Sequence, residues 1–346
     1  MFHVLNLTED FVLESGEVLR DFKIAFHTFG TYRPDADNVV WVCHALTANS
    51  DVADWWPHTV EDGKFLDPEK WFVVCANIIG SPYGTTSPIS INPATSSPYY
   101  IDFPRFTIRD IVKAHSILAD HLGIDAIHTL VGSSVGGFQA VEWAVMQPSR
   151  IRRLALIATD AKASPWSIAL DETQRMAIRA DSSFAECRPG GGSKGLAAAR
   201  ALALLSYRGP LCYNLSQQDS PADPDADNSE CSPFMIHRAQ TYQHHQGKKL
   251  VDRFDAYCYM AILDAFDTHD AGRGRGGLTN ALASISAKTL VVAISSDIIF
   301  SPDEMKTMAR LIPSASYVEI DSPMGHDGFL VEHQKLNNLM IPFMNS

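Results

Sequence analysis

The sequence predicts an α/β fold in which a mostly parallel sheet is interrupted by a helical insertion. Strand-like apolar runs alternate with helix-like patterns as far as Thr159, the alternation stops between about residues 164 and 279, and it resumes at Thr289. Strands that alternate with helices form parallel sheets covered on both faces. We therefore expect a core built from residues 1–163 and 280–346, with residues 164–279 as a helical lid over the strand ends.

Each expected element has its own pattern in the sequence. Short runs of apolar, β-branched residues predict six buried strands, at residues 38–43, 71–76, 127–131, 153–158, 289–294 and 315–320. Apolar residues close to a 3.6-residue period predict core helices at 108–122 and 138–146, and lid helices at 171–180, 195–207 and 253–267. The polar, acidic segment 216–232 is expected to be an exposed loop.

Composition and charge narrow the classes of function. The chain has 346 residues, of which 46% are hydrophobic, and a formal net charge of −12. Such an acidic protein is poorly suited to bind nucleic acid or anionic membranes. No apolar run approaches the roughly 18 residues that cross a bilayer, and residues 1–20 lack the basic start of a signal peptide. These features predict a cytoplasmic protein whose partners are small molecules, with no nucleic acid and no membrane.

The cysteines and histidines give no sign of a metal site. Six cysteines are scattered without a CxxC pair, so we expect free, reduced thiols. His244-His245 has no metal-ligand spacing around it. The segment Gly272–Gly277 contains G-x-G-x-x-G, but it follows an acidic segment, so a junction between lid and core is favoured over a dinucleotide-binding turn. The sequence predicts no metal and no permanently bound cofactor.

A candidate nucleophile lies in Gly132–Gly136, which reads G-S-S-V-G and fits the G-x-S-x-G motif. The motif follows an apolar strand and precedes a helix, and this context favours a true nucleophile elbow over a chance match. The tight turn exposes the Ser134 hydroxyl at a helix N-terminus, where the helix dipole stabilises developing negative charge. Ser133 does not fit, because Val131 would then occupy the first glycine position. The motif therefore predicts an α/β-hydrolase fold with Ser134 as nucleophile.

A serine nucleophile needs a histidine base and a carboxylate that orients it. In the α/β-hydrolase fold the acid and then the histidine follow the serine along the chain. Asp297 comes just after the predicted strand 289–294, and His326 comes shortly after the strand 315–320. His44 also follows a strand, but that loop supplies an oxyanion-hole N–H in this fold, so His44 is interpreted as structural. The predicted catalytic triad is Ser134, His326 and Asp297.

Longer segments of the chain resemble the homoserine O-acetyltransferases. The matching segments cover nearly the whole chain and are residues 44–47, 55–56, 77–93, 102–109, 132–144, 164–178, 252–275, 295–300 and 322–332. The resemblance implies the same triad and an oxyanion hole made of the backbone N–H groups of Leu46 and Val135. It also implies an amino-acid site containing Arg200, Tyr207 and Asp327. A guanidinium for the carboxylate and a carboxylate for the ammonium suit a zwitterion.

The activity implied by this resemblance is transfer of an acetyl group from acetyl-CoA to the hydroxyl of L-homoserine by a ping-pong route. The product, O-acetyl-L-homoserine, would feed methionine biosynthesis, and the family's homodimers imply a dimer formed through the lid. Alternatives are L-serine as acceptor, succinyl-CoA as donor, an esterase with the same triad, and a binding module with an inactive site. A succinyl group would favour an additional cation, and none can be assigned from the sequence.

Five positions depart from the common family pattern. Many relatives have Gly-Gly-Cys where this chain has Gly80-Ser81-Pro82, and glycine where it has Ser87. At the elbow, many have methionine in place of Val135 and glycine in place of Ser133. These loops lie near the catalytic site in the family, so the departures bear on the identity of donor and acceptor rather than on the mechanism.

Overall fold

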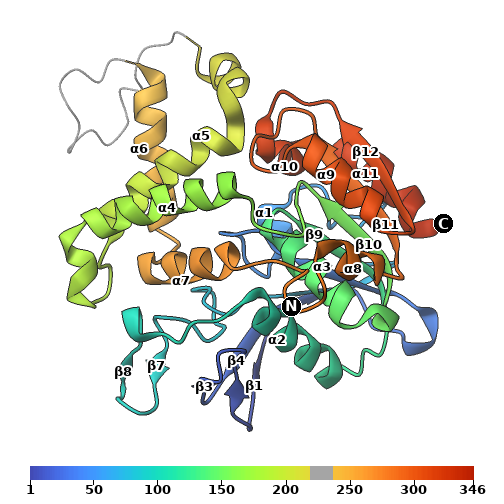
Figure 1. The fold of residues 1–346 in the computed structure, drawn as a ribbon, viewed down its shortest axis with the longest axis horizontal. Coiled ribbons are helices and arrows are strands. Elements are labelled where there is room, and N and C mark those ends of the chain that lie inside the picture. The colour runs from blue at the N-terminus through green and yellow to red at the C-terminus, as the bar shows by residue number, and fades with distance from the viewer. Residues whose placement is uncertain (219–236) are drawn as a thin grey trace.

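The computed structural model describes residues 1–218 and 237–346, and a twisted sheet flanked by helices lies at its centre (Figure 1). The predicted strands are present as β5 (Val39–Cys43), β6 (Phe72–Ala76), β9 (Ile127–Ser133), β10 (Ile151–Ile157), β11 (Lys288–Ile294) and β12 (Ala315–Ile320). Neighbouring members of this set pair in parallel, in the order β6-β5-β9-β10-β11-β12. The predicted α/β fold with a mostly parallel sheet is confirmed.

Two strands that the sequence analysis missed complete an eight-stranded sheet. They are β1 (Phe2–Asn6) and β4 (Lys23–Phe29); β4 pairs antiparallel with both β1 and β6. No side chain of β1 is fully buried, so the edge strand carries no continuous apolar run. Two short hairpins lie outside the sheet, β2 (Phe11–Val12) with β3 (Val18–Leu19), and β7 (Ile91–Asn92) with β8 (Ser97–Pro98).

Alternating strand residues build a core on each face of the sheet. In β5, Val39, Trp41 and Cys43 join one apolar cluster, and Val40 and Val42 join the other. The first cluster includes side chains of α2 (Ile108–His121), α3 (Val135–Met146), α8 (Leu278–Ala283) and α9 (Pro302–Leu311). The second includes α1 (Val52–Trp55), α10 (Gly328–Val331) and α11 (His333–Asn345). Both faces are therefore covered, as a parallel sheet requires.

The segment between β10 and β11 is helical and stands to one side of the sheet (Figure 1). Its helices are α4 (Pro165–Ala180), α5 (Ser193–Gln217), α6 (Arg238–Val251) and α7 (Ala256–Asp267). The sequence predicted parts of α4, α5 and α7. It missed α6, which is rich in polar residues and buries only Thr241, Gly247 and Leu250. Of the predicted loop 216–232, residues 216–217 end α5 and residues 219–232 lie outside the described part.

The loop Gly272–Gly277 joins this helical segment to the core. Arg273 pairs with Glu14 at 2.9 Å, and Arg275 pairs with the buried carboxylate of Glu142. The loop's arginines thus hold the chain where it returns to the sheet.

Five short 3-10 helices complete the secondary structure of the described residues: Pro34–Ala36, Tyr100–Asp102, Pro148–Arg150, Ser182–Glu186 and Gly325–Asp327.

Cysteine pairing was predicted to be absent. Cys43, Cys75, Cys187, Cys212 and Cys258 are free thiols, and Cys231 lies outside the described residues. Across residues 1–218 and 237–346, no helix is both long and apolar enough to span a bilayer.

Candidate active site

Ser134 lies at the sharp turn between β9 and α3. Its backbone has φ 55° and ψ −132°, a conformation that residues other than glycine rarely adopt. Two hydrogen bonds hold it there: Ser134 N–H donates to the Ile157 carbonyl at 3.0 Å, and Thr159 Oγ1 donates to the Ser134 carbonyl at 2.6 Å. The strained turn is therefore fixed from β10 and from the residues that follow it, and it carries the hydroxyl out of the sheet.

The two glycines of the motif allow the close approach that this turn requires. A Cβ atom on Gly132 would lie 2.4 Å from the Gly136 carbonyl oxygen, and one on Gly136 would lie 2.1 Å from the Cys43 carbonyl oxygen. Both contacts are with backbone, which cannot move aside as a flexible side chain can. The G-x-S-x-G pattern is thus required by packing between β9, α3 and the end of β5.

The structure brings Ser134, His326 and Asp297 into one hydrogen-bonded series. Ser134 Oγ lies 2.8 Å from His326 Nε2, and His326 Nδ1 lies 2.7 Å from Asp297 Oδ2. An ionised carboxylate only accepts hydrogen bonds, so Nδ1 carries the proton in the neutral ring and Nε2 is free to accept from the serine. This is the arrangement in which a histidine can remove the serine proton.

The loops after β11 and β12 hold the acid and the base. Asp297 Oδ1 accepts the backbone N–H groups of Ile299 at 2.8 Å and Phe300 at 3.1 Å, which leaves Oδ2 for the histidine. The Ser296 hydroxyl accepts the Gly325 N–H at 2.9 Å and thereby ties the two loops together. Burial lowers the pKa of His326, but the adjacent Asp297 carboxylate outweighs it and raises the pKa above its ordinary value.

The two predicted oxyanion-hole residues line the same pocket as Ser134. Val135 is the first residue of α3, where a backbone N–H has no acceptor within the helix. Leu46 lies in the loop after β5. His44 fixes that loop: its Nδ1 donates to the Ala45 carbonyl at 2.8 Å, and its Nε2 accepts the Ile78 N–H at 3.2 Å. Burial lowers the pKa of His44 to about 4, which suits a neutral, structural side chain.

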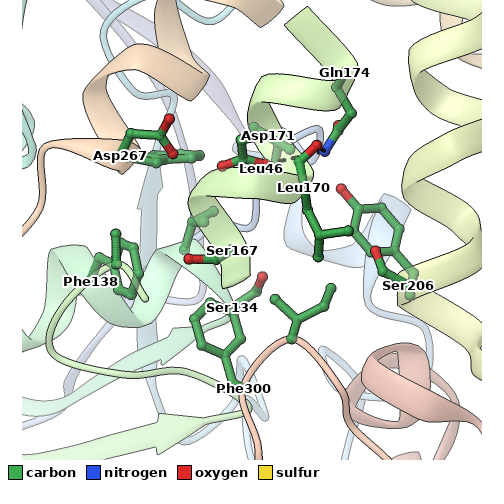
Figure 2. A pocket seen from close by; sticks show the side chains of 15 residues that line it. Leu46, Ser134, Phe138, Ser167, Leu170, Asp171, Gln174, Ser206, Asp267 and Phe300 are labelled. Carbon is green, nitrogen blue, oxygen red and sulfur yellow. Dashed lines mark hydrogen bonds between the residues drawn. The ribbon is translucent and has the colours of Figure 1, made fainter. Parts of the chain in front are cut away.

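A pocket extends from Ser134 toward the lid (Figure 2). Its wall combines residues of the core with residues of α4, α5 and α7: Leu46, Ser134, Val135, Phe138, Ala163, Ser167, Leu170, Asp171, Gln174, Ser206, Tyr207, Phe266, Asp267, Ile299 and Phe300. The candidate nucleophile therefore lies at the base of the pocket, and helices α4, α5 and α7 contribute eight of its fifteen lining residues.

The residues that the resemblance assigns to amino-acid binding lie around α5. Tyr207 lines the pocket, and its ring lies 6.0 Å from that of His326. The Arg200 guanidinium stands 5.3 Å from the centre of the Tyr207 ring. Asp327 directly follows the base and forms an ion pair with Arg208 at 3.0 Å. Arg200 and Asp327 themselves do not line the pocket described above, whereas Tyr207, over which Arg200 stands, does.

Sequence reasoning missed several residues that shape this site. Arg208 is the partner of Asp327, and Thr159 holds the carbonyl of the nucleophile. Arg253 of the lid donates to the Tyr83 hydroxyl at 2.7 Å and also to the Thr47 carbonyl, next to the predicted oxyanion-hole loop. No local sequence pattern predicts these contacts, because each contact joins segments that are distant in the sequence. Within the described ranges, no group of His, Cys, Asp and Glu side chains is arranged to hold a metal ion.

The fold and the sequence can be compared with known proteins. Residues 38–333 match the α/β hydrolase fold family. The homoserine O-acetyltransferase of Cyclobacterium marinum is 42% identical over 331 residues, which is 96% of this chain and 92% of that protein. That of Chlorobium chlorochromatii is 39% identical and covers 100% of this chain and 95% of its own length.

A solved structure with a similar fold is homoserine O-acetyltransferase from Bacillus anthracis, with a TM-score of 0.89 and 24% identity over 100% of this chain and 98% of that one. Esterase E22 is as similar in fold, with a TM-score of 0.89 and 23% identity over 99% of both chains. These two structures share the fold of this chain, whereas the sequence relatives establish the family. The chain belongs to the homoserine O-acetyltransferase family of α/β-hydrolase-fold enzymes.

Proposed function

We propose that this enzyme transfers an acetyl group from acetyl-CoA to the hydroxyl of L-homoserine by a ping-pong mechanism. The observation that carries the proposal is the hydrogen-bonded series Ser134–His326–Asp297 at the base of a pocket, in a chain 42% identical to a homoserine O-acetyltransferase. A serine, a neutral histidine and a carboxylate in this order suit nucleophilic acyl transfer.

In the first half-reaction, His326 Nε2 accepts the Ser134 proton while Oγ attacks the thioester carbonyl carbon. The backbone N–H groups of Leu46 and Val135 stabilise the oxyanion. The carbon–sulfur bond then breaks, the proton passes from His326 to the leaving thiolate, and the acetyl group remains on Ser134 as an ester. The raised pKa of His326 supports this cycle, because Asp297 stabilises the imidazolium form that each step creates.

In the second half-reaction, the hydroxyl of the acceptor gives its proton to His326 and attacks the acetyl carbon. Ser134 leaves with the proton, and O-acetyl-L-homoserine is released. We assign the acceptor carboxylate to Arg200 and Tyr207, and the acceptor ammonium to Asp327. The Arg208–Asp327 ion pair supports a charged site at this position. The ammonium group of the acceptor would compete with Arg208 for the Asp327 carboxylate.

The cellular setting belongs to the same proposal. We place the enzyme in the cytoplasm as a homodimer, with its product feeding methionine biosynthesis and no permanently bound cofactor. The homodimer is supported by α5, which exposes Leu202, Leu205, Leu211 and Leu215, with 38–57% of each residue accessible. A second copy of the lid would bury such a row of leucines.

Ester hydrolysis by the same triad is the second candidate, because esterase E22 has an equally similar fold. The two functions share the acyl-enzyme and differ in whether an amino acid or water attacks it. Thiol release from acetyl-CoA and from succinyl-CoA is measured with homoserine, with L-serine, or with neither. The proposed function predicts release that depends on homoserine and on acetyl-CoA, whereas equal release without an amino acid would favour the hydrolase.

A further inference from the structure

The pocket above Ser134 contains two carboxyl groups and no cationic side chain. Of the fifteen residues drawn in Figure 2, Asp171 of α4 and Asp267 of α7 are acidic, and none is Lys, Arg or His. In this view both aspartates lie on the lid side of the pocket, above Ser134. The triad itself does not explain their presence, since neither carboxyl group contacts Ser134, His326 or Asp297.

Asp171 and Asp267 come from helices α4 and α7, which pack against each other, and both side chains line the same pocket. Burial, together with the neighbouring charge of Asp267, raises the pKa of Asp171 well above its ordinary value. Gln174 donates to Asp171 Oδ1 at 3.1 Å, and Arg175 donates to Asp267. Burial therefore favours the protonated form of Asp171, whereas Asp267 is held by an arginine.

The surroundings of the pair leave this end of the pocket electronegative. Arg175 also binds Glu172 at 2.6 Å and Asp264 at 3.4 Å, so its single positive charge is divided among three carboxylates. Arg179 contacts Glu172 at 3.0 Å. The charged and titratable groups around the pair are Glu172, Arg175 and Arg179 of α4, Arg200 and Tyr207 of α5, and Tyr259 and Asp264 of α7. In the pocket wall itself, the pair supplies the charge.

We propose that the Asp171–Asp267 pair is a charge filter for the acyl group. It disfavours donors whose acyl chain ends in a second carboxylate and leaves short neutral acyl chains unhindered. An added carboxylate in this pocket faces two acidic side chains and no cation among the lining residues, so its binding is disfavoured. The inference rests on one part of the proposed function, acylation of Ser134, and on neither CoA nor homoserine.

The test compares two esters of equal chain length, p-nitrophenyl butyrate and p-nitrophenyl hydrogen succinate. Both acylate a serine nucleophile and release the same phenolate, and they differ in a terminal methyl or carboxylate. In the wild type, acylation by the butyrate ester is faster by about tenfold or more. In D171N/D267N the ratio falls about tenfold. D171N alone should change the ratio less than D171N/D267N, since burial favours the neutral form of the carboxyl group that asparagine replaces.

The pH dependence of the butyrate-to-succinate rate ratio provides a second test, which compares the wild type with the conservative single variant D171N. Titration of His326 affects both esters equally and cancels in the ratio, while the succinate carboxylate stays ionised throughout. As the pH rises and Asp171 loses its proton, the wild-type preference for butyrate increases, because the raised pKa of Asp171 delays its ionisation; in D171N this increase is absent. A wild-type ratio that is constant with pH, or an unchanged ratio in a D171N/D267N protein whose thermal unfolding is intact, would overturn the filter. Thiol release from acetyl-CoA, measured on the same samples, tests the proposed function separately.

Discussion

The floor of the pocket, where Ser134 lies, and the side formed by the lid helices are built in different ways. Ser134, Asp297 and His326 follow β9, β11 and β12, and hydrogen bonds within the core fix each of them. On the lid side, Arg200 stands over the Tyr207 ring and Asp327 is bound to Arg208. The proposed triad is therefore held by the sheet, whereas the proposed acceptor-binding residues Arg200 and Tyr207 belong to a lid helix that lies against it.

One close contact between the two regions lies beside the histidine of the triad. Gly325, next to the catalytic histidine, has φ 65°, and a Cβ atom there would lie 2.7 Å from the Tyr207 carbonyl oxygen. Helix α5 kinks just beyond this point, where Gly209 has non-helical angles and Pro210 follows. Next to this kink, the backbone of α5 lies against the loop that carries His326.

The largest expected effect separates the nucleophile from its neighbour. Ser134→Ala removes the attacking oxygen, and we expect acylation by the donor to fall by about 10⁵–10⁶-fold. Ser133→Ala is the matched control: its hydroxyl is buried without a hydrogen-bond partner among the described residues, so activity should stay close to that of the wild type. Mass spectrometry after mixing with donor alone measures the acyl-enzyme. Normal turnover by folded Ser134→Ala protein would contradict the mechanism.

A second test addresses the electrostatics of the core. Asp297→Asn should lower kcat by about 10³–10⁴-fold, because the histidine loses the partner that fixes its tautomer. His326 must be neutral to act as a base, and Asp297 raises its pKa. The acidic limb of the wild-type kcat/KM profile should therefore lie above the ordinary value of about 6.5, and it should move to lower pH in the variant. An unmoved limb would mean that this carboxylate does not control the base.

A third change acts on the lid side alone. Arg200→Ala should leave acylation of Ser134 nearly intact and weaken use of homoserine by about 30- to 5,000-fold, the equivalent of about 2–5 kcal/mol for a buried charge-assisted contact. Arg188→Ala, which removes an exposed lid arginine paired with Glu186, is the control and should change neither half-reaction. Single-turnover acylation and acceptor titration are measured separately. Equal loss in both halves would refute the division between core and lid.

The smallest expected effect concerns stability of the core. Burial lowers the pKa of His115 to about 4 in the folded protein, whereas an unfolded histidine titrates near 6.5. The unfolded chain therefore binds the proton first, so this contribution to stability is complete above about pH 6.5 and declines until about pH 4. The free energy of unfolding should fall by up to about 1.4 kcal/mol per pH unit for this group. Urea unfolding of His115→Gln should show a shallower decline.

The core was more predictable from sequence than the lid. Apolar runs in the sequence predict the parallel strands. The glycine spacing around Ser134 is required by a turn that tolerates no side chain at two positions. The edge strand β1 and helix α6 lack such patterns because few of their residues are buried. The Arg208–Asp327 ion pair joins residues far apart in the chain, and the pocket brings Asp171 and Asp267 together in the same way. Contacts of that kind depend on tertiary packing, which no local pattern specifies.

The central claim is that this enzyme passes an acyl group from Ser134 to an amino acid rather than to water. The most direct measurement isolates the acetylated enzyme after mixing with acetyl-CoA and follows its decay with homoserine, with L-serine, and with buffer alone. The account predicts slow decay in buffer, rapid decay with homoserine, and formation of O-acetyl-L-homoserine in an amount equal to the acetyl group lost. Decay that is equally fast in all three solutions, with acetate as the product, would contradict it.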